Sequence, residues 1–174
     1  MQYDPRHSTK PPSSIEPTGF FTGIRFRPII GGVVVDVVTS FALGQLYYWF
    51  FVAKDSMAEG AAAEDAFSQY WNSSDGLVVG LLLGSLGTMI GGFYAAYKAG
   101  TLEMKHGALV GIGSIILGLV LQAVFPTEEF PEWFMALSFA AAVPAGALGG
   151  FFAEMFKNAM RGGSPTSGSW PAPR

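Results

Sequence analysis

The chain has 174 residues, of which half are apolar and only 13% are charged, and it contains 23 glycines and no cysteine. This composition is unusual for a soluble domain and indicates a polytopic membrane protein. The lack of cysteine excludes disulfides, thiolate metal sites, iron–sulfur clusters and thiol catalysis. The net charge of −3 says little by itself, because the charges are segregated along the chain.

Both ends of the chain have a low-complexity composition. Residues 1–19 are rich in Pro, Ser and Thr, and they and residues 157–174 are predicted to form flexible tails. We see no cleavable signal in the first tail and expect the first apolar run to act as its own insertion signal. Residues 20–27 mix aromatic side chains with Arg25 and Arg27, which is typical of a segment at the level of the lipid headgroups. A plain basic flank of the first span is the alternative.

Four apolar runs within residues 28–156 are each long enough to cross a bilayer core of roughly 30 Å. We predict transmembrane helices over residues 28–51, 76–97, 107–125 and 133–156, and therefore an all-α fold with a compact bundle of four spans. In the longest connection, a capping-box pattern and an alanine-rich stretch predict a short surface helix within residues 56–71. The expected interfacial anchors are Tyr47, Tyr48, Trp49, Trp71, Trp133, Arg25 and Arg27.

The basic residues are distributed unevenly between the two sides of the predicted bundle. Nine of the ten Lys and Arg residues fall in the two terminal segments and in the turn between the second and third spans, and only Lys54 falls on the opposite side. The positive-inside rule then predicts that both termini and this turn are cytoplasmic, in a bacterial inner membrane. The ends of the second and fourth spans are alike, GGFYAAYKAG and GGFFAEMFKNA, which indicates two tandem two-helix repeats.

Small residues form the strongest pattern in the spans. In the second span glycines recur every three or four residues, and the third and fourth spans repeat the pattern. Small residues let helix backbones approach closely in lipid, so we favour a glycine zipper that packs the bundle, and a face for lipid, a pigment or a partner helix is the alternative. The predicted packing residues are Gly76, Gly80, Gly84, Gly87, Gly91, Gly107, Gly111, Gly118, Gly146 and Gly150.

Asp36 is the one ionisable residue well inside a predicted span. It follows Pro28 by eight residues, or roughly 12 Å along a helix, which places it near the bilayer midplane. We expect it to face the bundle, where Ser40, Ser114 and Gln122 are the other intramembrane polar residues. Two interpretations stay open: a proton or cation site, or a neutral carboxyl that hydrogen-bonds to a neighbouring span.

One stretch of about 30 residues, GGFYAAYKAGTLEMKHGALVGIGSIILGL, carries a resemblance. Its Gly-Gly-aromatic-x-Ala-Ala ending of one span and its His-Gly-Ala-Leu-Val-Gly opening of the next resemble a broad group of small, uncharacterised, four-span bacterial membrane proteins. The resemblance implies the four-helix architecture and no particular activity.

The sequence favours a structural role. It has no clustered nucleophile, base or metal-ligand set, so we expect no enzyme activity, no metal and no cofactor beyond contact with bound lipid or a peripheral pigment. The first expectation is an accessory or assembly subunit of a respiratory or photosynthetic membrane complex, with clasping tails. Its partners would be membrane lipids and other membrane subunits, and no nucleic acid. The alternative is a small oligomeric transporter or channel, linked to protons or cations through Asp36.

Overall fold

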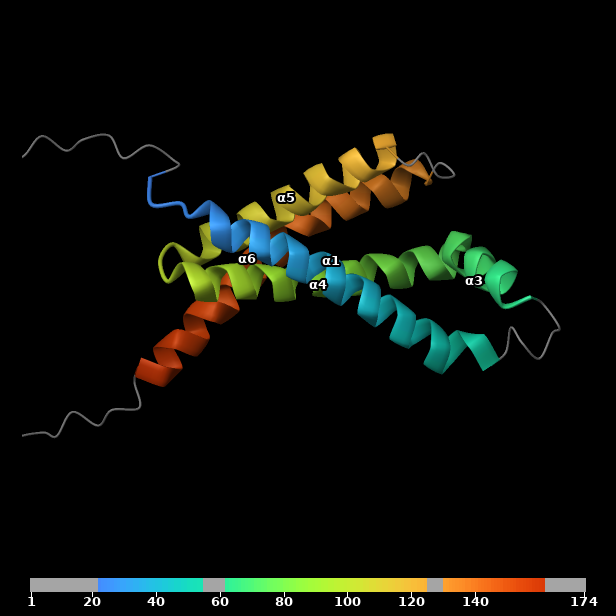
Figure 1. The fold of residues 1–174 in the computed structure, drawn as a ribbon, viewed down its shortest axis with the longest axis horizontal. Coiled ribbons are helices and arrows are strands. Elements are labelled where there is room, and N and C mark those ends of the chain that lie inside the picture. Colours follow the sequence, from blue (N-terminus) through green and yellow to red (C-terminus); the bar gives the residue numbers. More distant parts are fainter. Residues whose placement is uncertain (1–21, 55–61, 125–129, 162–174) are drawn as a thin grey trace, which may run out of the picture.

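A computed structural model describes residues 22–54, 62–124 and 130–161 of the chain. These residues form helices and short connections, with no strand among them, and Figure 1 shows their arrangement. Four helices are long and apolar enough to cross a membrane, which confirms the predicted all-α fold with four membrane-length helices. In chain order the elements are α1 (Phe26–Tyr47), the π-helical segment η1 (Tyr48–Val52), α3 (Ala63–Asn72), α4 (Ser74–Ala99), α5 (Glu103–Val124) and α6 (Glu132–Arg161).

Local signals determine several features of these helices. Ser73 caps α4, because its hydroxyl oxygen accepts a hydrogen bond of 3.1 Å from the backbone N–H of Gly76, and Asp75 adds a negative charge in the first turn. The helix ends at Gly100, whose φ of 76° favours glycine. Pro144 in the interior of α6 cannot donate a backbone hydrogen bond, and Figure 1 shows α6 changing direction near its middle.

The four long helices are packed at one end and splayed at the other. They converge at the end that carries the α4–α5 turn, here called the turn end (Figure 1). Toward the opposite end, which carries α3 and is here called the α3 end, α5 and the first half of α6 diverge from α1 and α4. The buried apolar core lies near the turn end, where Ile29, Ala95 and Val110 meet. The bundle is therefore less compact than the sequence predicts.

Glycine permits the close approach of the helices near the turn end. A Cβ atom added at Gly91 would collide with the backbone of α1, and one added at Gly107 or Gly111 would collide with the backbone of α6. The predicted glycine stripe is not uniform, however, because nothing lies within 4 Å of a Cβ added at Gly84 or Gly118. Of the other glycines, Gly76, Gly87, Gly92, Gly146, Gly149 and Gly150 also meet the backbone of a neighbouring helix, and Gly80 meets the side chain of Trp71.

Polar side chains fasten the turn end. His106 is fully buried, its Nε2 accepts a hydrogen bond of 3.0 Å from the backbone N–H of Arg25, and its Nδ1 lies 3.1 Å from the carbonyl oxygen of Leu102. These two partners require the tautomer with its proton on Nδ1. Lys157 of α6 donates a hydrogen bond of 3.0 Å to a carbonyl in the last turn of α4 and forms an ion pair of 3.1 Å with Glu103 of α5.

Candidate functional site

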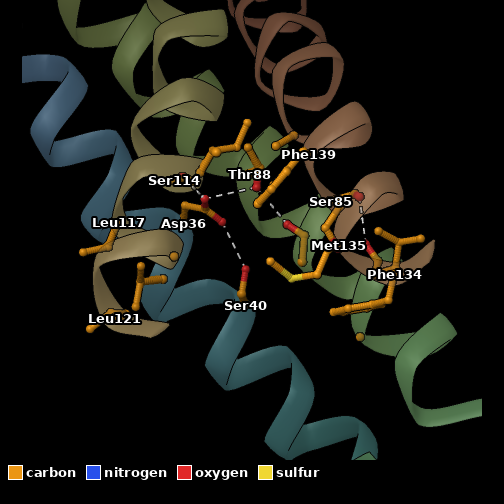
Figure 2. A pocket seen from close by; sticks show the side chains of 18 of the residues that line it. Asp36, Ser40, Ser85, Thr88, Ser114, Leu117, Leu121, Phe134, Met135 and Phe139 are labelled. Carbon is orange, nitrogen blue, oxygen red and sulfur yellow. Dashed lines mark hydrogen bonds between the residues drawn. The ribbon is translucent and has the colours of Figure 1, made fainter. Parts of the chain in front are cut away.

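A cavity of about 540 Å³ lies between the four long helices, in the half of the bundle nearer the α3 end. Helices α1, α4, α5 and α6 all contribute to its wall. Most of this wall is apolar, and Figure 2 shows Leu117, Leu121, Phe134, Met135 and Phe139 among the side chains around it. The four helices therefore line a partly open space of the size that proteins use to bind small molecules.

Asp36 lies at the end of this cavity that is nearest the turn end. Among the cavity-lining residues of α1, Asp36 lies closest to the turn end. Thr88 holds the same position among the lining residues of α4, and Ser114 among those of α5. The side chain of Asp36 is only 5% exposed, so it faces the other helices rather than lipid. The cavity thus has a polar floor and largely apolar walls.

Hydroxyl groups from three helices surround the carboxyl group of Asp36, as Figure 2 shows. Ser40 donates to Oδ1 at 3.1 Å and Thr88 donates to Oδ2 at 3.1 Å. Ser114 of α5 also donates to Oδ2. The two helices packed nearest to α1 therefore each supply a donor to the one buried carboxyl group in the described part of the chain.

The sequence predicts only some of these residues. It identifies Ser40 and Ser114 as intramembrane polar residues, whereas Thr88 is missed, although Thr88 lies four residues after Gly84 on the same face of its helix. That spacing is the signal that could have found it. Gln122, which the sequence also identifies, lines the cavity eight residues beyond Ser114, or roughly 12 Å along α5, and therefore lies well above the floor.

The hydrogen-bond network fits both protonation states of Asp36. The Oγ1 atom of Thr88 lies within hydrogen-bond distance of two acceptors, Oδ2 of Asp36 at 3.1 Å and the carbonyl oxygen of Gly84 at 3.0 Å. The hydroxyl has one proton and can donate it to only one of them at a time. When Asp36 is ionised, Thr88 donates to the carboxylate. When Asp36 is protonated, its own O–H can donate to Thr88, which then donates to Gly84.

No described side chain that lines the cavity carries a positive charge to neutralise Asp36. Among the described residues that line the cavity, Asp36 is the only ionisable one. An ionised carboxylate is costly in a low-dielectric interior unless a positive charge accompanies it, and hydroxyl donors offset only part of that cost. The carboxyl group of Asp36 is therefore the one group among these lining residues that can pair with a bound proton or cation.

Comparisons with known proteins do not assign a function to this site. No protein-family model, curated protein or solved structure matches the chain. The resemblance to small four-span bacterial membrane proteins stays a prediction. Within the described ranges, no group of three or more His, Asp or Glu side chains is placed to hold a metal ion. The geometry around Asp36 is therefore the basis for a functional argument.

Aromatic side chains join α3 to the end of α1. Tyr48 is only 2% exposed, and its ring meets that of Phe67 edge-on, with ring centroids 4.8 Å apart. Tyr48, predicted as an interfacial anchor, is therefore covered by α3 and buried inside the protein, and its place relative to a bilayer stays a prediction. Trp71 of α3 packs between α1 and α4, with its ring 3.7 Å from the positions of Cβ atoms added at Gly44 and Gly80.

The other aromatic residues predicted as anchors lie in different surroundings. Trp49 and Trp133 are 52% and 43% exposed, which leaves both side chains accessible to a bilayer interface. Tyr47 is half-buried, and its ring stacks on that of Tyr70. Burial, together with a hydrogen bond to Tyr47, raises the pKa of Tyr70 well above its ordinary value, so its phenol group stays neutral at physiological pH.

The two predicted arginine anchors line a second, smaller pocket at the start of α1. Its wall contains three cationic residues, Arg25, Arg27 and Lys98. The guanidinium group of Arg25 also donates a hydrogen bond of 3.3 Å to the carbonyl of Ala99, which closes the end of α4. This pocket lies at the turn end and shares no residue with the cavity of Asp36.

Proposed function

We propose that this chain is a membrane transport protein in which Asp36 binds a proton or a cation. The observation that carries the proposal is the position of this carboxyl group, 5% exposed at the polar floor of a cavity that four membrane-length helices line. A buried carboxyl group without a cationic partner is costly in a membrane, and such residues usually mark a path for ions or protons.

Two further features support transport rather than storage of a bound ion. The cavity extends from Asp36 toward the α3 end, whereas backbone contacts at glycines close the bundle toward the turn end. The distribution of Lys and Arg predicts that the turn end is cytoplasmic, so in this proposal the cavity faces the opposite side of the membrane. Pro144 interrupts the hydrogen bonds of α6 beside the floor of the cavity and provides a place for that helix to bend.

The test is proton and cation flux into liposomes that contain the purified full-length chain and a fluorescent reporter of internal pH or of the cation. The Asp36→Asn variant keeps the size of the side chain and removes its proton-binding group. We expect its flux to fall to that of empty liposomes. Ser85→Ala is the matched control, because Ser85 lines the same cavity but donates to the carbonyl of Leu81 on its own helix, at 2.7 Å. Its flux should match that of the wild type.

Two outcomes would overturn the proposal. One is an Asp36→Asn variant with wild-type flux, and the other is a wild-type chain without flux under any imposed gradient of pH, sodium, potassium or an organic cation. A folding defect is recognised by gel filtration and by the helical circular dichroism of each variant. The Asp36→Glu variant keeps the titratable group, so it should retain part of the flux if the carboxyl group itself is required.

The accessory-subunit role expected from the sequence depends on the two tails. Most of both tails lies outside the described residues, and the role assigns no purpose to a cavity with a buried carboxyl group. It therefore stays a prediction, and it gains support if the reconstituted chain carries no flux. The proposed tandem repeat and the cytoplasmic placement of both termini likewise depend on the sequence patterns alone.

A further inference from the structure

We infer that the cavity binds an organic cation, a molecule with a positively charged nitrogen or phosphorus centre attached to an apolar body. This inference rests on the proposed function and specifies the ligand of the same site. Three properties of the cavity carry it: the charge of its floor, the apolar character of its walls, and the space that two of its glycines leave open.

The charge of the floor selects the sign of the ligand. Asp36 is the only ionisable residue among the described residues that line the cavity, and Ser40, Thr88 and Ser114 contribute neutral hydroxyl groups. An anionic ligand would face this carboxyl group with no positive side chain to offset the repulsion. A positive ligand supplies the missing counter-charge, and an ammonium group can also donate to the carboxylate and to the hydroxyl oxygens.

The walls select the body of the ligand. Hard metal cations such as Mg²⁺ and Ca²⁺ take about six to eight oxygen ligands, many of them water, and the apolar walls above Asp36 offer few oxygens. An organic cation needs no such shell, because its apolar body gains from contact with the walls. Phe41, Phe134 and Phe139 line the cavity, and aromatic rings attract organic cations through their faces.

Two glycines in the cavity wall are not needed for close packing of the helices, and they leave free space beside the helix backbone. Gly84, which is half-buried, and Gly118, which is exposed, both line the cavity, and no atom lies within 4 Å of a Cβ added at either position. Elsewhere on the same helices glycine allows backbones to touch, but here its absent side chain leaves the cavity wider than a larger residue would. The volume of about 540 Å³ falls within the ordinary range of small-molecule sites.

The experiment compares two probes of nearly the same size and shape and of opposite charge, tetraphenylphosphonium and tetraphenylborate. Binding of each to the purified full-length chain in detergent is measured by equilibrium dialysis. We expect saturable binding of tetraphenylphosphonium only, because Asp36 is the only ionisable side chain that lines the cavity within the described residues.

Variants separate the role of charge from the role of space. Asp36→Asn should abolish saturable binding of the cation. Gly118→Leu should also abolish it, by filling the cavity without altering the carboxyl group. Ala123→Leu is the matched control, because Ala123 is exposed on the same helix, as Gly118 is, but lies outside the cavity wall. It should bind as the wild type does.

The inference is overturned if both probes bind equally, if neither binds, or if Gly118→Leu binds the cation as well as Ala123→Leu does. These outcomes are distinct from failure of the proposed function. Proton flux that requires Asp36, without binding of tetraphenylphosphonium, would refute the organic cation and leave proton transport standing. Binding of tetraphenylphosphonium that requires Asp36, without any flux, would support the ligand class and refute transport.

Discussion

Two glycines on α4 provide a direct test of how the bundle is packed. A Cβ atom added at Gly91 would collide with the carbonyl of Gly32 and would lie 2.9 Å from the Cβ atom and 3.1 Å from the backbone nitrogen of Asp36. A Cβ atom added at Gly84, seven residues earlier on the same helix, would have no neighbour within 4 Å. We therefore predict that Gly91→Ala and Gly84→Ala change the stability of the protein in opposite directions.

The expected magnitudes follow from two terms. Replacing glycine by alanine inside a helix gains about 0.5–1 kcal/mol from backbone conformational freedom, and this gain is shared by the two variants. Forcing an additional methyl group into a closely packed contact costs about 1–3 kcal/mol, and only Gly91→Ala incurs that cost. The shared gain cancels in the difference, so Gly91→Ala should be less stable than Gly84→Ala by about 1–3 kcal/mol.

The free energy of unfolding is measured in mixed micelles with an increasing fraction of a denaturing detergent, and tryptophan fluorescence and circular dichroism report the transition. Wild type and both variants are compared at the same protein concentration. If Gly84→Ala lowers the stability as much as Gly91→Ala does, Gly84 is in contact with a neighbouring backbone, and the cavity is closed in the folded protein. That result would refute both the packing argument and the site built on the cavity.

Three further predictions concern polar contacts and use the same unfolding measurement. Thr88→Val removes a donor to Asp36 and should cost about 0.6–1.7 kcal/mol, whereas no loss would show that the hydroxyl group does not bond to the carboxyl group. Lys157→Met removes the hydrogen bond to α4 and the ion pair to α5; it should cost about 1 kcal/mol, and a loss that disappears in high salt would identify the ion pair as its source. His106→Leu leaves the backbone N–H of Arg25 without its acceptor and should cost about 1–3 kcal/mol, whereas His106→Gln, which keeps an acceptor, should cost less.

The spans are predictable from sequence because lipid imposes simple rules on length and polarity. A helix that crosses the membrane needs about 20 apolar residues, and its backbone polar groups must be satisfied internally, so the apolar runs identify the helices. The splay of the helices at the α3 end is not predictable in this way. It depends on how far α5 and α6, which pack together at Gly111, diverge from α1 and α4, and hydropathy contains no information on crossing geometry.

The candidate site is predictable in part. A lone carboxyl group in an apolar run must face protein, which identifies Asp36 from the sequence. Its partners depend on the depth and rotation of neighbouring helices, which one sequence does not specify. Ser114 meets Asp36, whereas Gln122 on the same helix lies roughly 12 Å further along the cavity, although both have the polarity that the pattern requires. Tyr48 shows the same limit, because an aromatic residue at a helix end fits a lipid interface and a protein core equally well.

Asp36 belongs both to the cavity and to the contact that closes the turn end. Its carboxyl group forms the polar floor, and its backbone is part of the close contact of α1 with Gly87 and Gly91 of α4. Thr88, whose hydroxyl lies within hydrogen-bond distance of both the carboxyl group and the carbonyl of Gly84, stands between Gly87 and Gly91 in the sequence. A change of charge at Asp36 is therefore applied directly to the α1–α4 contact, with no intervening residue. In the proposed transport function, binding at the floor of the cavity must alter the packing that closes the turn end, and Asp36 takes part in both.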